Sequence, residues 1–122
     1  MAALWKMILL SPDGDRECMA APTEVPGLYV AAWQAGPPSR QWTVTHHSGI
    51  GVATDLPDPE AALAAASDLG ALMAWDRPAA EINAAILADP ELSGRVITIA
   101  ERWGGDCIGH EAGPDLIERA SA

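Results

Sequence analysis

WTVTHHSGIGVATDLPDPEAALAAASDL, residues 42–69, holds two apolar runs, a tight reversal between them and the start of a helix. In the first run Trp42, Val44 and His46 alternate with threonines, the period of a strand with one apolar face. Ser48-Gly49 suits a reversal, and the run that follows returns along the first. This part of the chain therefore predicts an antiparallel hairpin.

A helix is predicted directly after the hairpin. Asp58 can cap the free N–H groups, Pro59 suits the first helical position, and Glu60 lies where the helix dipole favours an anion. Apolar and small residues then recur at spacings of three and four, as expected for a helix that lies on a sheet: Leu63, Ala66, Gly70 and Met73.

Two further strands are predicted before the hairpin. Residues 5–10 form an apolar run ended by a Pro-Asp-Gly turn, and residues 28–33 are bounded by Pro-Gly and Gly-Pro-Pro. Residues 13–26 hold four acidic groups and two prolines without a clear period, which predicts an acidic surface loop.

Two more helix starts follow, at Asp76-Arg77-Pro78 and Asp89-Pro90-Glu91. After the second start, Leu92, Val96, Ile99 and Trp103 fall on one helical face. We therefore expect one α+β domain over residues 1–122, with an antiparallel meander of three to four strands packed against two to three C-terminal helices. Residues 106–122 are expected to form a loosely attached tail.

The charge balance narrows the possible partners. In 122 residues, seven Lys and Arg stand against 17 Asp and Glu, for a net charge of −10. Phosphate backbones and anionic lipids would repel such a chain, so generic nucleic-acid and membrane binding are disfavoured. Only Arg40 carries a formal charge between residues 27 and 54, so the predicted sheet is nearly neutral.

The composition also predicts a location. No apolar stretch approaches the ~18–20 residues of a membrane span, and the first apolar run is too short for a secretory signal. We expect a cytoplasmic protein in which Cys18 and Cys107 are reduced thiols.

His46 and His47 are the most tempting chemical pair. Neighbours on a strand point to opposite faces, so we expect one ring in the core and the other toward solvent or a partner. The alternatives are proton transfer, ligand contact, or a zinc site in which one of them joins three distant groups: Cys18, Cys107 and His110. A structural zinc site needs four ligands, and Cys107 and His110 supply only two from one segment, so the other two would have to come from distant loops. The prediction is therefore no metal and no cofactor.

No nucleophile elbow and no phosphate-binding glycine loop is present, so no catalytic residue is assigned. Binding residues are predicted instead on the neutral sheet: Arg40, Trp42, His46 and His47. An exposed tryptophan there suits an interface or a stacked base.

One resemblance adds a context. W-x-V-T-H at residues 42–46, the Ser-Gly turn, and an Ala-rich helix closed by Trp75 resemble short uncharacterised accessory proteins of actinobacteria and their phages. The resemblance implies a small mobile-element or phage protein and supplies no catalytic residues.

Two functions follow as hypotheses. The first is a non-enzymatic accessory protein in the host cytoplasm that binds a host protein through acidic surfaces, as an inhibitor or a mimic of nucleic acid. The alternative is a homodimer that binds or sequesters a nucleotide-like small molecule on the neutral sheet. An enzyme ranks third.

Overall fold

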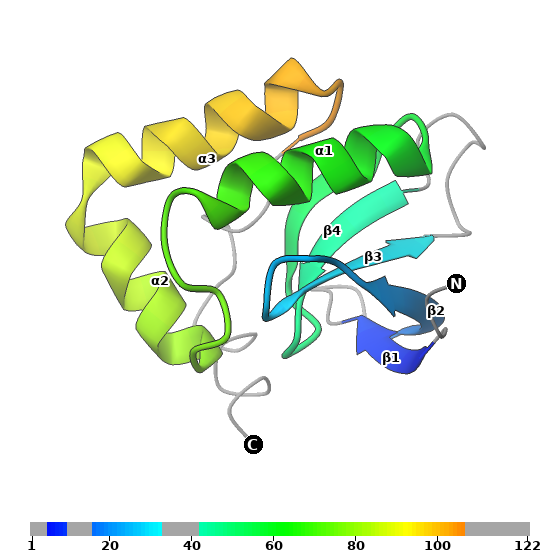
Figure 1. Ribbon diagram of the computed structural model, residues 1–122. Coiled ribbons are helices and arrows are strands. Elements are labelled where there is room, and N and C mark those ends of the chain that lie inside the picture. The colour runs from blue at the N-terminus through cyan, green and yellow to red at the C-terminus, as the bar shows by residue number, and fades with distance from the viewer. Residues whose placement is uncertain (1–4, 10–15, 33–41, 107–122) are drawn as a thin grey trace.

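The computed structural model describes residues 5–9, 16–32 and 42–106 of the chain. Within them a five-stranded sheet is followed by three helices (Figure 1). The elements are β1 (Trp5–Leu9), β2 (Arg16–Pro22), β3 (Leu28–Ala32), β4 (Trp42–His46), β5 (Gly51–Leu56), α1 (Pro59–Gly70), α2 (Ala79–Ala88) and α3 (Pro90–Arg102). The predicted α+β class is confirmed, with more strands than the three to four expected.

The sheet is an antiparallel meander in which each strand pairs with the next along the chain, in the order β1-β2-β3-β4-β5. The additional strand is β2, which lies inside the predicted acidic loop of residues 13–26. That prediction was wrong for residues 16–22, because their extended form comes from ladders to β1 and β3 and not from a local apolar period.

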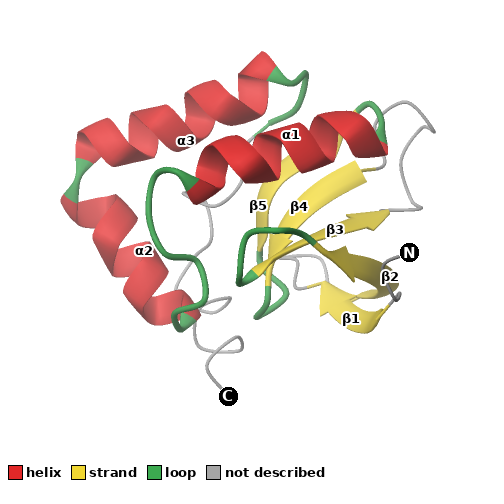
Figure 2. Ribbon diagram, in the orientation of Figure 1, coloured by secondary structure: helices red, strands yellow, loops and turns green. Residues whose placement is uncertain are grey.

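All three helices lie on one side of the sheet, and α1 crosses over β3, β4 and β5 (Figure 2). The buried face of α1 consists of small residues and one leucine: Ala62, Ala65, Ala66 and Leu69. Alanines let the helix axis approach the strands closely, which explains why an Ala-rich segment covers the sheet.

The predicted helix starts are confirmed. The Asp58 Oδ1 accepts the N–H of Ala61 at 2.7 Å, with Pro59 at the first helical position. The same arrangement recurs at α3, where the Asp89 carboxylate accepts the N–H groups of Glu91 and Leu92. α2 begins directly after Pro78, without a side-chain cap.

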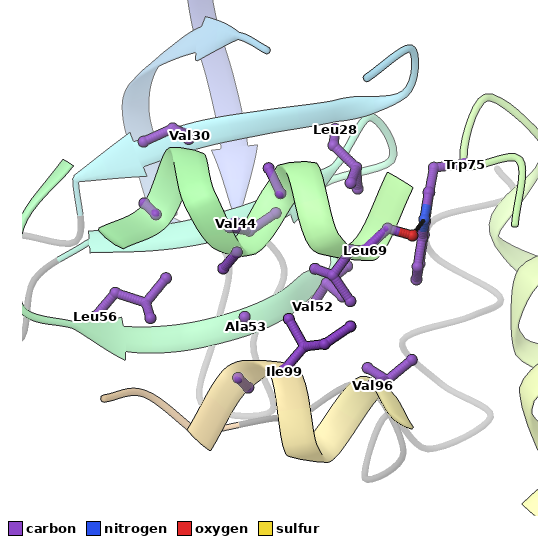
Figure 3. Close-up of a cluster of buried hydrophobic side chains, with 14 of the residues drawn as sticks. Leu28, Val30, Val44, Val52, Ala53, Leu56, Leu69, Trp75, Val96 and Ile99 are labelled. Atoms are coloured by element: carbon purple, nitrogen blue, oxygen red, sulfur yellow. Dashed lines mark hydrogen bonds between the residues drawn. The ribbon is translucent and has the colours of Figure 1, made fainter. Parts of the chain in front are cut away.

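The core lies between the sheet and the helices (Figure 3). Leu28, Val30 and Val44 of the strands lie along the length of α1, and Val96 and Ile99 of α3 pack on the side of β5. Trp75, in the α1–α2 connection, is 1% exposed, and its Nε1–H donates to the carbonyl of Leu69 at 2.8 Å. The connection is therefore part of the core.

Gly27 fits against this connection because it has no side chain. Its φ is +91°, and a Cβ built there would lie 2.2 Å from the carbonyl oxygen of Trp75. Only glycine allows the β2–β3 turn to approach the α1–α2 connection so closely.

Candidate functional site

The two neighbouring histidines meet at one backbone carbonyl. The Nε2 atoms of His46 and His47 lie 2.9 and 3.0 Å from the carbonyl oxygen of Arg77. The ring centroids are 3.9 Å apart, with the ring planes inclined by 38°. As expected, one ring is buried, that of His46, and the other, that of His47, is exposed. The rings nevertheless do not point to opposite faces, because β4 ends at His46 and His47 already belongs to the turn before Gly49.

The hydrogen bonds fix the tautomer of His46. A carbonyl oxygen only accepts, so Nε2 of His46 carries the proton and donates it to Arg77. Nδ1 is then the acceptor, and it receives the Ser48 hydroxyl at 2.7 Å and the Ser48 backbone N–H at 3.2 Å. Both ring nitrogens are therefore occupied.

Burial keeps this ring neutral. His46 is 2% exposed, and desolvation lowers its pKa to about 4, helped by the neighbouring charge of His47. The carbonyls of Arg77 and Trp75 act in the opposite direction and are the weaker influence. His46 is consequently a poor proton carrier near neutral pH.

We call His46, His47, Ser48 and the Arg77 carbonyl the histidine cluster. It joins the β4–β5 turn to the α1–α2 connection. The backbone N–H of His47 also donates to the carbonyl of Gly27, in the β2–β3 turn, at 2.9 Å. The cluster thus ties three connections together at one end of the sheet. His47 is exposed, and it is the member of the cluster whose ring a partner can reach.

Trp42, a further predicted binding residue, does not belong to this cluster. Trp42 is half-buried at the far end of β4 and packs against the core. Its face of the sheet, shared with Val44 and His46, is the one that α1 covers. Arg40 lies outside the described residues, so a binding role for it stays a prediction.

Metal and thiol chemistry find little support in the described part of the chain. No three His, Cys, Asp or Glu side chains within residues 5–9, 16–32 and 42–106 lie close enough together to hold a metal ion. Cys107 and His110 fall outside these ranges. Cys18 is a free, half-buried thiol, and burial raises its pKa, which disfavours the nucleophilic thiolate.

The structure contains a groove of about 730 Å³ between α1 and α3 that was not predicted from the sequence. Its charged residues neutralise one another in pairs: Arg95 with Glu91, at 2.6 Å, and Arg102 with Asp68, at 3.3 Å. The signal in the sequence was Gly94, a helix-interior glycine whose missing side chain opens onto free space.

Outside these pairs the helical part of the chain is strongly acidic. Residues 57–106 contain three arginines and nine carboxylates, which are Asp58, Glu60, Asp68, Asp76, Glu81, Asp89, Glu91, Glu101 and Asp106. Each arginine is paired with a carboxylate, Arg77 with Glu81 at 3.2 Å. The other six carboxylates have no cationic partner among the described side chains, and all six residues are exposed.

None of the helices in the described residues combines the length and the apolar composition needed to cross a bilayer. No protein-family model, curated protein or solved structure matches this chain.

Proposed function

We propose that this chain is a non-enzymatic binding protein whose acidic helical layer docks on a basic surface of a protein partner. The observation that carries the proposal is the charge of residues 57–106. Their three arginines are already paired, and six exposed carboxylates remain. Such a surface attracts cationic proteins and repels nucleic acid and anionic lipid.

Two of the six carboxylates have structural duties as helix caps, Asp58 and Asp89. The side chains of three others make no hydrogen bond or ion pair with a described residue: Glu60, Asp76 and Glu101. Their charges do not contribute to the fold through any such contact, which leaves them available to a partner. The histidine cluster supports a binding role over a catalytic one, because both nitrogens of its buried ring are used in the fold.

The biological setting belongs to the same proposal. In an accessory protein of a phage or mobile element, in the cytoplasm of an actinobacterial host, an acidic layer of this kind would block a basic site on a host factor. A site that normally binds nucleic acid is the natural target, because carboxylates can take the place of backbone phosphates. DNA should then compete with this protein for its partner.

Zero-length carbodiimide coupling suits the test, because it joins carboxylates of this chain to lysines of whatever touches them. The tagged protein is expressed in an actinobacterium, coupled, purified and analysed by mass spectrometry. We expect links from Glu60, Asp76 and Glu101 to lysines of one partner. The affinity for that purified partner should fall from about 0.1 to about 1 M NaCl, where the Debye length shrinks from about 10 to about 3 Å.

Two charge variants provide the matched comparison. Glu60→Gln/Asp76→Asn/Glu101→Gln removes three charges from the helical layer, and we expect about tenfold weaker binding or more. Asp13→Asn/Asp15→Asn/Glu24→Gln removes three charges from another part of the chain and should leave the affinity nearly unchanged. Equal effects of the two variants, or binding that ignores salt, would contradict the proposal.

A further inference from the structure

The two edge strands of the sheet, β5 and β1, differ in how well they are protected against pairing with another strand. At the β5 edge, Thr54 exchanges two backbone hydrogen bonds with Asp106, at 2.7 and 2.8 Å. The same strand has irregular register against β4 and a positive φ of 59° at Asp55. Bridged, bulged strands resist the addition of another strand.

The β1 edge has none of these protections. β1 is in continuous register with β2 over all five residues, from Trp5 opposite Ala20 to Leu9 opposite Arg16. No strand in the described part of the chain pairs with its outer side. Its single charge, on Lys6, is already engaged with Glu17. A regular strand with an unpaired edge is a template for one more strand.

Beside this edge lies exposed apolar surface. Ile8 of β1 and Met19 of β2 are 48% and 49% exposed. Ile8 shares a face with Met19, because Lys6 is opposite Met19 and Ile8 follows Lys6 by two residues. This is the face that the helices cover farther along, because Ala21, two residues after Met19, is opposite Val30 of the core. α1 contacts β3, β4 and β5, so β1 and β2 extend beyond it (Figure 1).

The charge distribution indicates what covers this surface. β1 and β2 contain two cations and one carboxylate, Lys6, Arg16 and Glu17, whereas residues 57–106 contain nine carboxylates and three arginines, a net charge of −6. Two copies of a chain with a net charge of −10 repel each other least where their neutral ends meet. An edge contact at β1 keeps both acidic layers at the far ends of the pair.

We propose that two copies of this protein associate by antiparallel pairing of β1 with β1, so that the two sheets become one. The register follows from Lys6. If the twofold axis passed through Met7, Lys6 of one chain would lie diagonally beside Lys6 of the other chain. If the axis passes through Ile8, the two Ile8 side chains are opposite each other and the two ammonium groups are farther apart. The contact therefore has Ile8 on its twofold axis.

The mass in solution tests the contact. Sedimentation equilibrium should give twice the 12.7 kDa of one chain at high concentration. Ile8→Lys puts like charges opposite each other and should return the chain to a monomer, with an unchanged circular dichroism spectrum. Leu63→Lys is the matched control, since Leu63 is 50% exposed on α1, and it should remain dimeric. If the wild-type chain is still a monomer at about 0.5 mM, its self-association is too weak to be significant, and the proposal is overturned.

Disulfide trapping tests the register. In a Cys18→Ser/Cys107→Ser background, oxidation should convert Ile8→Cys to a covalent dimer, because the two thiols face each other across the axis. Lys6→Cys, on the same strand, should form no covalent dimer under the same conditions, because its two thiols lie apart in this register. Cross-linking of Lys6→Cys without Ile8→Cys would refute the register. Cross-linking of neither, in a protein that sediments as a dimer, would place the contact elsewhere.

Discussion

The Nε2–H of His46 donates to the carbonyl oxygen of Arg77 at 2.9 Å, across 31 positions of sequence. This bond joins the end of β4 to the segment that leads into α2. Protonation would leave this donor in place but would remove the Nδ1 lone pair that accepts from Ser48, so the buried arrangement of the ring requires neutral imidazole. The connection between α1 and α2 is thereby coupled to the protonation of one side chain.

Acid should weaken the fold through His46. In the unfolded chain His46 titrates near 6.5, and in the folded protein its pKa is about 4. Between these values the unfolded state binds more protons, so the free energy of unfolding falls as the pH drops from about 6.5 to about 4. Over this window the loss attributable to His46 is roughly 3 kcal/mol, and it levels off below. Urea denaturation at a series of pH values measures it.

Two glutamine variants isolate this contribution. His46→Gln should be less stable at neutral pH and should lose the part of the pH dependence between 4 and 6.5. His47→Gln, at an exposed position on the same carbonyl, should retain it. If His46→Gln kept this pH dependence and His47→Gln lost it, the assignment of the titration to His46 would be wrong.

Two glycine-to-alanine changes should act in opposite directions. Gly27→Ala must fit a Cβ 2.2 Å from the Trp75 carbonyl at a positive φ, and we expect a loss of roughly 2–5 kcal/mol. Gly94→Ala meets nothing within 4 Å in the interior of α3, and it should stabilise the protein by roughly 0.5–1 kcal/mol. Thermal melts of both variants beside the wild type are sufficient. Similar losses for both would contradict the close packing of Gly27.

Local signals in the sequence were sufficient for the helix starts, but the predicted buried face of α1 was wrong at two positions, because Leu63 is 50% exposed and Met73 lies beyond the end of the helix at Gly70. Asp-Pro-Glu occurs at the start of both α1 and α3, and each aspartate caps its helix as expected. The Val-Ile-Thr-Ile run at residues 96–99 is β-prone, yet it is helical, because its apolar positions fit the face of α3 that packs on the core. β2 could not be found in this way, since its pairing partners, and not its own residues, make it a strand.

The site was less accessible to sequence reasoning. The residues of the histidine cluster were visible, but their common partner is a backbone carbonyl, and the sequence gives no sign of which carbonyl a ring will reach. Trp42 and Trp75 likewise look alike in sequence. Only the packing shows that one is half-buried at a strand end and the other is enclosed.

That difference between tryptophans should be measurable. Trp75→Ala removes a fully buried ring and its hydrogen bond to Leu69, and it should cost roughly 3–5 kcal/mol. Trp42→Ala should cost less, about 2 kcal/mol, because its ring is only partly buried against the core. Chemical denaturation gives both values. A larger loss at Trp42 would mean that the core is centred on β4 and not on the α1–α2 connection.

Asp68 should hold α1 and α3 together. Its Oδ2 accepts the Trp103 Nε1–H at 2.9 Å and an Arg102 N–H at 3.3 Å, so one carboxylate of α1 holds the end of α3. Asp68→Ala should lower stability by about 1–2 kcal/mol, since the group is only partly shielded from water. It should also shift Trp103 fluorescence to longer wavelength as the indole loses its partner.

Two companion variants separate the hydrogen bond from the charge. Asp68→Asn keeps an oxygen that can accept from Trp103, so it should recover part of the lost stability. Asp76→Ala removes an exposed carboxylate without a described partner, so it should change stability by less than about 0.5 kcal/mol. If Asp68→Ala behaves like Asp76→Ala, the helices are held by apolar packing alone. The groove beside Asp68 would then keep its shape without this carboxylate.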